Sequence, residues 1–378
     1  MARIKVFFSC SGVGILDRGI ETFFREAFNG LRSLAELDLT LYKGAGEEKA
    51  DEHVLWNVPR TAGLGRFLGK LINRDSYVVE QHSFLLPLIR RIRAERPDIV
   101  FTSDGNLLRR LFQFRKQIGV PFHLLFSNGG PVDPPYPFAD YVHQVAPYYY
   151  EQALAAGVSP DRQSMVPYGI TIPDRVPDIS AEAKHRLRVQ LGLPEDRKIV
   201  LSVGWITAQH KRMDYLVSEV AALPQPRPYL VLLGAMDASS RAIVELANAK
   251  LGPSGFTART ISYQDIAMYY QAADIFALAS LKEGFGRVFL EALIHGLPVT
   301  AHKHPVMEFV LDGQATLADL TKQGALAAAL ICLLHREGND GASAIVRRES
   351  VRRRFSWEVL SPDYLKMFLV CARARSSS

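Results

Sequence analysis

The feature that most constrains the fold is an alternation of short apolar runs with longer segments of helical periodicity. In the first half, residues 4–8, 99–102 and 122–126 form short apolar runs, and residues 20–34 have a helical pattern. Short buried strands separated by helices are typical of βαβ units. The first half is therefore predicted to form a parallel sheet covered by helices.

The same alternation of strands and helices begins again in the second half, after a segment of different composition. Proline and glycine are spread through residues 167–196 around one short charged helix, 181–191. We place the linker at 171–196, between a first domain at 1–170 and a second at 197–357. A chain of 378 residues is too long for one ordinary core, so two doubly wound domains with a cleft between them are predicted. The second-half strands and helices are expected at 199–203, 214–222, 229–233, 241–251, 275–277, 288–295 and 298–300.

The formal net charge of +6 favours anionic partners, whether phosphates, nucleic acid or acidic lipids. Basic residues cluster at 90–96, 109–110 and 347–354. These clusters either form solvated helix faces or touch a membrane surface. No run approaches the roughly 20 apolar residues of a bilayer-spanning helix, so any membrane contact is expected to be peripheral.

The cysteines argue against two kinds of structural site. Cys10, Cys332 and Cys371 are widely separated and show no ligand-like spacing, so neither a disulfide framework nor a zinc site is expected. Residues 3–8 lead directly into a glycine loop and read as a first strand rather than a signal sequence. A reducing, cytoplasmic compartment is the simplest interpretation.

The most specific pattern in the chain is the segment from Glu283 to Glu291, EGFGRVFLE. A helix is predicted to begin near Gly286, so its first backbone amides face the carboxyl edge of the sheet. Gly284 and Gly286 allow a ligand to approach the backbone closely. Glu283 can accept hydrogen bonds from sugar hydroxyls, and Glu291 lies about a turn and a half into the helix. The alternative is that Glu283 only caps the helix or interacts favourably with its dipole, and that Glu291 is a solvated helix residue.

A second pattern lies after the strand at 199–203, which ends at Gly204. Two adjacent cations, Lys211 and Arg212, arrive where the next helix begins. Cations at a helix N-terminus oppose the helix dipole, so local stability does not explain them. An anion held between these cations and the backbone amides would explain them. We therefore expect phosphate binding here, with a solvated basic turn as the alternative.

Polar loops also follow two strands of the first domain. The opening loop contains Gly12 and Gly14, but Asp17 occupies the third glycine position of the dinucleotide fingerprint. We interpret this loop as a glycine turn facing the cleft. Residues 103–106, Ser-Asp-Gly-Asn, follow the strand at 99–102, at the edge where an open α/β sheet carries function.

Four motifs, in order along the chain, resemble the retaining glycosyltransferases of family 4, which belong to the group 1 glycosyltransferases. The matching segments are 166–170, 270–274, 283–291 and 292–300. The resemblance implies a GT-B fold, with two Rossmann-like domains facing across a cleft. It also implies that a C-terminal helix, 358–378, crosses back onto the first domain.

The resemblance further implies a role for each donor-site residue. Glu283 would hold the donor sugar's hydroxyls, and Glu291 would bind the ribose hydroxyls of the nucleotide. Lys211 would neutralise the diphosphate as it becomes the leaving group. The expected catalytic residues are Glu283, Lys211 and Arg212. The expected donor-binding residues are Gly14, Gly204, Lys211, Arg212, Glu283, Gly284, Phe285, Gly286 and Glu291.

The chain also departs from the family's pattern. Trp205 stands where the family usually has arginine, and Arg212 stands where glycine usually follows the lysine, so Arg212 is expected to replace the missing cation. The family often has a histidine in the first domain near the reacting centre. The corresponding segment, 126–130, carries the neutral Asn128. Asn128 and Gly12 are assigned to the acceptor side.

The resemblance therefore predicts a retaining hexosyltransferase that acts in bacterial polysaccharide or glycoconjugate synthesis. Its donor would be a nucleotide sugar, and its acceptor a glycan, a lipid-linked molecule or a small molecule, with no nucleic acid partner. No cofactor or metal is expected, because no Asp-x-Asp motif is present to chelate a metal diphosphate. A cytoplasmic location is expected, and peripheral contact with the inner face of the membrane stays open. Two alternatives also stay open: a GT-B nucleotide-sugar epimerase and a nucleotide-sugar-binding protein without turnover.

Overall fold

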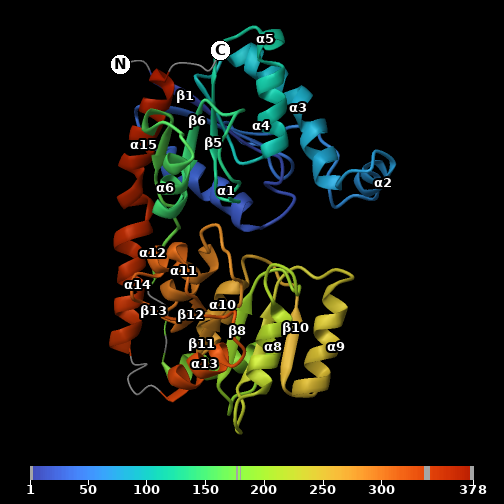
Figure 1. Ribbon diagram of the computed structural model, residues 1–378, viewed down its shortest axis with the longest axis vertical. Helices are drawn as coiled ribbons and strands as arrows, with labels where there is room; N and C mark the ends of the chain where they lie inside the picture. The colour runs from blue at the N-terminus through green and yellow to red at the C-terminus, as the bar shows by residue number, and fades with distance from the viewer. Residues whose placement is uncertain (1–2, 176–177, 179, 336–340, 375–378) are drawn as a thin grey trace. The chain divides into compact units, whose positions relative to one another are not determined.

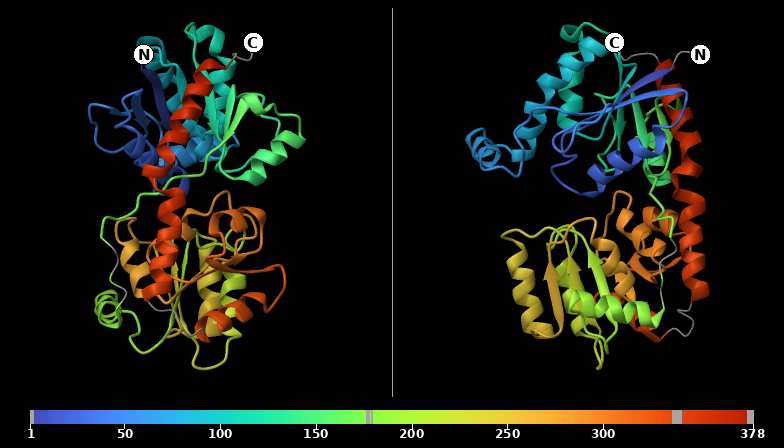
Figure 2. Two further views of the ribbon diagram at one scale, coloured as in Figure 1. Left: turned by 90° about the vertical axis from the view of Figure 1, so that its left-hand side faces the viewer. Right: turned by 180° about the vertical axis from the view of Figure 1, so that it is seen from behind.

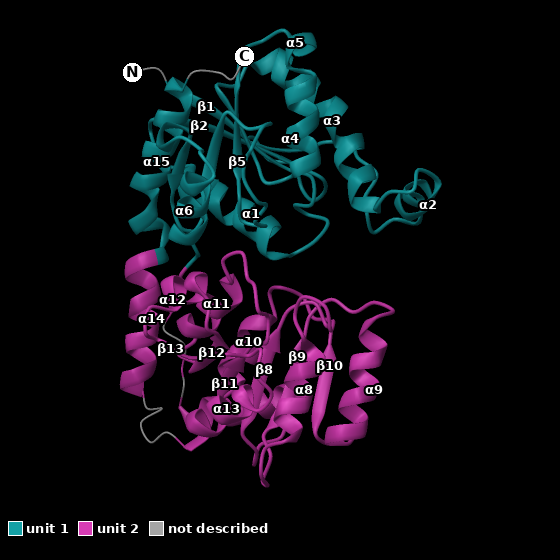
Figure 3. Ribbon diagram, in the orientation of Figure 1, with its two compact units in different colours: residues 1–171, 355–378 teal, residues 172–354 magenta. Residues whose placement is uncertain are grey.

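The computed structural model describes residues 3–175, 178, 180–335 and 341–374. The chain divides into two compact units, which Figure 3 colours separately. Unit 1 contains residues 1–171 and 355–378, and unit 2 contains residues 172–354. Each unit is built on one parallel sheet packed with helices, as Figure 1 shows. The prediction of two parallel-sheet α/β domains is confirmed.

The sheet of unit 1 has the strand order β3-β2-β1-β4-β5-β6-β7, and its strands are parallel. Chain order changes direction between β1 and β4, so the loops after these two strands open at the topological switch point. The strands are β1 (Ile4–Cys10), β2 (Leu37–Lys43), β3 (Glu52–Val54), β4 (Ile99–Thr102), β5 (His123–Ser127), β6 (Tyr141–Gln144) and β7 (Gln163–Met165).

The helices of unit 1 include the C-terminal helix of the chain. They are α1 (Gly19–Leu31), α2 (Gly63–Leu71), α3 (Ser76–Glu95), α4 (Gly105–Gln113), α5 (Arg115–Ile118), α6 (Pro147–Ala155) and α15 (Trp357–Arg373). On α15, Phe368 makes edge contacts with Phe8 and Phe101, with ring centroids 6.0 and 5.7 Å apart. The Trp357 ring lies against Gly30 of α1, where a β-carbon would overlap it. Helix α15 therefore packs on unit 1, as the resemblance implies.

The sheet of unit 2 has the order β10-β9-β8-β11-β12-β13, and its strands are also parallel. Its switch point lies between β8 and β11. The strands are β8 (Ile199–Val203), β9 (Tyr229–Leu233), β10 (Phe256–Arg259), β11 (Ile275–Ala277), β12 (Val299–His302) and β13 (Ala315–Ala318). The helices are α7 (Ala181–Leu191), α8 (Met213–Ala221), α9 (Ser240–Leu251), α10 (Ile266–Ala272), α11 (Arg287–Ile294), α12 (Pro305–Leu311), α13 (Ala325–His335) and α14 (Gly341–Phe355).

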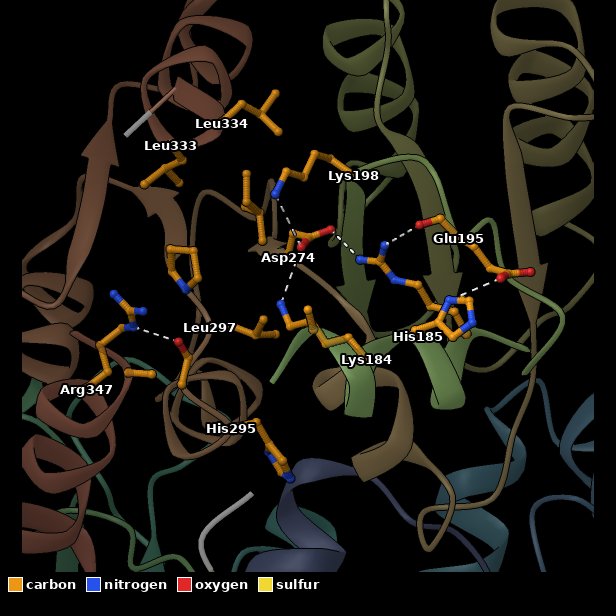
Figure 4. Close-up of a pocket in the computed structure, with 16 residues that line it drawn as sticks. Lys184, His185, Glu195, Lys198, Asp274, His295, Leu297, Leu333, Leu334 and Arg347 are labelled. Atoms are coloured by element: carbon orange, nitrogen blue, oxygen red, sulfur yellow. Dashed lines mark hydrogen bonds and ion pairs between the residues drawn. The ribbon is translucent and has the colours of Figure 1, made fainter. Parts of the chain in front are cut away.

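The segment predicted as a linker is built into unit 2 through one largely buried carboxylate, Asp274 (Figure 4). Asp274 Oδ2 accepts hydrogen bonds from Arg188 Nη2 at 2.6 Å and from the backbone N–H of Ile199 at 2.8 Å. Lys184 Nζ lies 3.3 Å from Asp274 Oδ1. Because Lys184 and Arg188 belong to α7, these bonds fasten α7 to the start of β8 and β11. Helix α7 of the predicted linker region therefore packs on unit 2.

The same residues line a pocket of about 390 Å³, drawn in Figure 4. Its walls include Lys198, Ile275 and Pro298, which stand at the amino ends of β8, β11 and β12. This is the sheet edge opposite the switch-point loops. Arg347 on the pocket wall donates to the carbonyl oxygen of Gly296 at 2.8 Å. Charged groups of the pocket thus connect α7 to Asp274, which precedes β11, and α14 to Gly296, which precedes β12.

Candidate active site

The loops after β8 and β11 bring Lys211 and Glu283 together at the switch point of unit 2. These residues are 72 positions apart in sequence, yet Lys211 Nζ lies 2.6 Å from Glu283 Oε1. Their side chains are 22% and 13% exposed, so the pair is shielded from bulk water but still open to a ligand. The structure therefore joins the two residues that two separate sequence patterns had indicated.

Glycine at two strand ends makes room for the lysine. Gly204, directly after β8, has φ +154°, and a β-carbon there would lie 3.1 Å from Lys211 Cε. Gly234, directly after β9, has φ +155°, and a β-carbon there would overlap the Gly204 carbonyl oxygen. The lysine stem thus crosses the backbone at Gly204. Our sequence reading missed Gly234, although its place after an apolar strand repeats that of Gly204.

The loop before α11 is shaped by packing. Gly286 has φ +80° and caps the helix, and a β-carbon there would lie 2.9 Å from Phe289 Cδ2 and 3.0 Å from Met307 Cε. The Phe285 side chain is only 3% exposed, so its ring lies inside unit 2, while Gly284 is half-buried. Gly286 therefore has a conformational reason to be glycine, in addition to the predicted close approach of a ligand.

Glu291 is tied to a buried tyrosine instead of being simply solvated. The Tyr270 hydroxyl donates to Glu291 Oε2 at 3.0 Å. Burial raises the pKa of Tyr270 well above its ordinary value, so the phenol stays protonated and keeps its donor role. The Tyr270 ring also stacks on His295, with centroids 5.3 Å apart. Glu291 is thus held in one orientation by a partner that our sequence reading did not identify.

Arg212 makes a hydrogen bond and a ring contact within unit 2. It caps α8 with φ +48°, and its Nη1 donates to the carbonyl oxygen of Leu320 at 2.7 Å. The guanidinium also lies over the Tyr215 ring, 4.3 Å from the centroid. These contacts fasten the loop after β13 to the start of α8. These contacts fix the position of Arg212 at the start of α8, and its predicted role as the replacement cation stays a prediction.

Asn128, assigned to the acceptor side from the sequence, is fully buried and makes its hydrogen bonds within unit 1. Its Nδ2 donates to the Tyr136 hydroxyl at 3.2 Å and to Gln144 Oε1 at 3.0 Å, and its Oδ1 accepts from the backbone N–H of Val132 at 2.9 Å. These bonds satisfy most of the hydrogen-bonding capacity of an amide side chain. Asn128 therefore fixes the loop after β5 from the inside.

The Gly12–Gly14 loop packs against its own unit. Gly14 has φ +83°, and a β-carbon there would overlap the carbonyl oxygen of Ala45. A β-carbon at Gly12 would overlap the Glu21 carboxylate and lie 3.0 Å from Arg60 Nη2. Both glycines are thus required by close approach within unit 1, and their predicted ligand contacts stay predictions.

Gly14→Ala is expected to lower the free energy of unfolding by about 3 kcal/mol, because both φ strain and a backbone overlap must be relieved. Gly157→Ala is the matched control: Gly157 has φ +85°, but a β-carbon there meets nothing within 4 Å. The control should cost only about 1 kcal/mol. Denaturant unfolding of the two variants measures the difference, and equal losses would show that the Ala45 contact does not matter.

A network of buried charges lies at the switch point of unit 1. Arg60 Nε donates to Glu80 Oε2 at 2.9 Å, and the Tyr77 hydroxyl donates to Asp104 Oδ1 at 2.6 Å. The backbone N–H of Ser11 donates to Asp104 Oδ2 at 3.1 Å, which links the loops after β1 and β4. The sequence indicated the Asp104 loop. It gave no signal for Glu80, which lies within the long helix α3.

Two kinds of feature are absent from the described residues. Within the described ranges, no helix is long and apolar enough to span a bilayer. Among the same residues, no three His, Cys, Asp or Glu side chains are grouped so that they could hold a metal ion.

Comparison with known sequences matches residues 183–348 to the family of glycosyl transferases group 1. The chain is 30% identical over 228 residues to a D-inositol 3-phosphate glycosyltransferase of Xylanimonas cellulosilytica, covering 58% of this chain and 54% of that protein. It is 29% identical over 150 residues to an alpha-monoglucosyldiacylglycerol synthase of Streptococcus pneumoniae, covering 39% of this chain and 34% of that protein. The matched region thus spans about a third to about half of these curated relatives.

Solved structures resemble the chain over nearly its whole length. A sucrose-phosphate synthase of Thermosynechococcus elongatus has a TM-score of 0.76 at 21% identity, covering 99% of this chain and 100% of that one. Anabaena HepE in complex with UDP-glucose has a TM-score of 0.74 at 17% identity, covering 97% and 100%. At these identities the likeness concerns the fold. Residues 183–348, which make up most of unit 2, thus match the group 1 glycosyl transferases, and both units have the parallel sheets of a GT-B fold.

Proposed function

We propose that this protein is a retaining hexosyltransferase, which moves a sugar from a nucleotide-diphosphate donor to an acceptor hydroxyl in bacterial glycan or glycolipid synthesis. The observation that carries the proposal is the Lys211–Glu283 pair at the switch point of unit 2. In open α/β sheets, ligands bind outside the carboxyl ends of the strands at this point. The names of the two relatives, a D-inositol 3-phosphate glycosyltransferase and an alpha-monoglucosyldiacylglycerol synthase, support this class of reaction. The complex of HepE with UDP-glucose supports a UDP-sugar as the first donor to test.

The pair can exchange partners when the donor binds. Without a ligand, Lys211 and Glu283 neutralise each other at 2.6 Å. The donor diphosphate would take the lysine ammonium in a charge-assisted contact, and sugar hydroxyls would replace the lysine as hydrogen-bond donors to Glu283. The Lys211 ammonium and the Glu283 carboxylate thus each keep a partner. An unpaired charge in this half-buried site would cost free energy. Glu291, oriented by Tyr270, would accept hydrogen bonds from the ribose hydroxyls.

The proposed step needs no enzyme nucleophile. The acceptor oxygen bonds to the anomeric carbon while the bond from that carbon to the phosphate oxygen breaks on the same face of the sugar. The acceptor proton passes to the departing phosphate oxygen. Lys211 stabilises the negative charge that grows on the diphosphate, which is the largest electrostatic change in the step.

Donor binding can be screened first by thermal unfolding with UDP-, GDP-, ADP- and dTDP-sugars, because a bound donor raises the melting temperature by mass action. With the donor that stabilises the chain, added acceptor should release nucleoside diphosphate, and NMR of the product should show the donor's anomeric configuration retained. Interconversion of donors without acceptor would instead favour an epimerase. Donor binding with no product over days would favour a binding protein without turnover.

Metal independence is a separate prediction. If Lys211 carries the phosphate charge, transfer measured in excess EDTA should stay within about twofold of the untreated rate, because no divalent cation is needed to stabilise the leaving group. The control is an Asp-x-Asp, metal-dependent glycosyltransferase assayed in the same buffer, which should lose its activity. Loss of activity in EDTA that returns with Mg²⁺ or Mn²⁺ would contradict the prediction.

A further inference from the structure

Helix α2 of unit 1 carries a cluster of exposed large apolar side chains. Leu64 is 57% exposed, Phe67 is 64% exposed and Leu71 is 71% exposed. Trp56, before the helix, is 70% exposed, and Ile72, directly after it, is 51% exposed. The first three are spaced i, i+3 and i+7, so they share one face of the helix. We call Leu64, Phe67 and Leu71 the α2 apolar face, and Trp56 and Ile72 flank it in sequence.

The rest of α2 explains why this face points away from the core. Gly65 and Gly69 are the helix's buried residues, and they let the backbone approach the neighbouring chain closely. A β-carbon at Gly65 would lie 2.5 Å from the Pro59 carbonyl oxygen, and one at Gly69 would lie 2.8 Å from the Arg74 carbonyl oxygen. The helix therefore packs through its glycines. Figures 1 and 2 show α2 projecting from the body of unit 1.

The concentration of apolar surface is unusual for this chain. Among the described residues, eighteen large apolar side chains are exposed, and five of them lie within residues 56–72. These five include the three most exposed, Leu71, Trp56 and Phe67. Single exposed apolar residues need no explanation, whereas a contiguous patch marks an interaction surface.

The charge around the α2 apolar face is mainly positive. Residues 53–74 contain no Asp or Glu, while Arg66, Lys70 and Arg74 are exposed. At helical spacing, Lys70 lies beside the apolar face, next to Phe67, whereas Arg66 lies nearer to the packed Gly69. The remaining cation of the segment, Arg60, is paired with Glu80 and is not available to a partner. An apolar helix face flanked mainly by cations, with Arg66, Lys70 and Arg74 against the exposed Asp75, matches the interfacial zone of an anionic bilayer, where acyl chains lie beneath negatively charged headgroups.

We infer that α2 is a membrane-docking element, which inserts the α2 apolar face into the surface of a bilayer that contains anionic lipid. Phe67 and Leu71 enter the acyl boundary, and Lys70, beside them on the helix, contacts lipid phosphates. This inference deepens the proposed role in glycolipid synthesis by naming the surface that brings the enzyme to a lipid acceptor. It does not depend on the donor chemistry, and the two are measured separately.

Sedimentation of the full chain with vesicles tests the inference. Wild type should bind vesicles of phosphatidylcholine with about one third phosphatidylglycerol, and it should bind phosphatidylcholine alone about tenfold more weakly. The double variant Phe67→Ser/Leu71→Ser should lower the partition coefficient on the anionic vesicles at least about tenfold, because it removes the two deepest apolar groups. The matched control is Leu86→Ser/Val189→Ser, which removes two apolar side chains that are 57% and 56% exposed elsewhere.

The control variant should bind vesicles like wild type, and both double variants should unfold at the wild-type temperature because the mutated side chains are exposed. Donor binding, measured by thermal shift, should be unchanged in both, so that loss of docking is distinguished from failure of the donor site. Equal vesicle binding by Phe67→Ser/Leu71→Ser and wild type would overturn the inference, and so would the absence of wild-type binding. A lipid-free dimer that only this variant abolishes would also overturn it, because a second copy would then cover the face.

Discussion

Glu283→Gln is expected to lower the rate of acceptor-dependent nucleotide release by about a hundredfold to a thousandfold. The substitution keeps the shape of the side chain but removes the charge that holds Lys211 at 2.6 Å and that would hold the donor sugar's hydroxyls. The loss should appear in kcat more than in KM, because the contact is proposed to strengthen as the sugar moves toward the transition state. Nucleotide release at saturating donor and acceptor measures it.

The same variant should keep or increase the affinity for nucleotide, although it loses transfer activity. Without Glu283, the Lys211 ammonium has no carboxylate to compete with a phosphate, so UDP alone should bind at least as tightly to Glu283→Gln as to wild type. Titration calorimetry measures this affinity. Lys211→Gln should weaken UDP binding about tenfold or more, because one charge-assisted phosphate contact is lost.

Two controls make the result interpretable. Glu245→Gln changes a glutamate on α9 whose side chain is 63% exposed, and it should leave transfer unchanged. Thermal unfolding should show that Glu283→Gln is folded. Transfer by Glu283→Gln within about threefold of wild type would contradict the proposed role, because a residue that positions the reacting sugar cannot be neutralised at so little cost.

Asp274→Ala is expected to lower the free energy of unfolding by about 3–5 kcal/mol. The carboxylate accepts from Arg188 at 2.6 Å and from the Ile199 amide at 2.8 Å, and it lies 3.3 Å from Lys184 Nζ. Its removal leaves two cations of α7 in a largely buried pocket. Burial already lowers the pKa of Lys184, which shows that this site disfavours an uncompensated charge.

The control for Asp274 is Asp196→Ala, which removes an exposed aspartate of the same region and should cost less than about 0.5 kcal/mol. Because Asp274 lies at the amino edge of the sheet, opposite the Lys211–Glu283 pair, Asp274→Ala should keep wild-type donor affinity at a temperature where it remains folded. A loss of stability below about 1 kcal/mol would show that α7 does not depend on this carboxylate.

Much of the framework could be predicted from local pattern. The strands at 99–102, 199–203, 229–233 and 275–277, and the helix at 181–191, were predicted with the observed bounds. Each strand is a short apolar run buried on both faces, so its sequence carries its own signal. Helix α3 was missed, since Pro87 and a run of arginines weaken its helical pattern. The short strands β3 and β7 were missed because their sequences, Glu-His-Val and Gln-Ser-Met, form no apolar run.

The sequence by itself determined the two parallel-sheet units and the two loops that supply Lys211 and Glu283, because chain order fixes which strands lie beside the switch point. Tertiary structure alone decided what the surrounding polar residues do. Asn128 and Arg212 look like ligand-binding residues in sequence, but their partners, Gln144 and the Leu320 carbonyl, come from distant segments that only folding brings near. Likewise, local sequence cannot tell an apolar helix face that is buried from one that is exposed, and only the packing of Gly65 and Gly69 turned Phe67 and Leu71 outward.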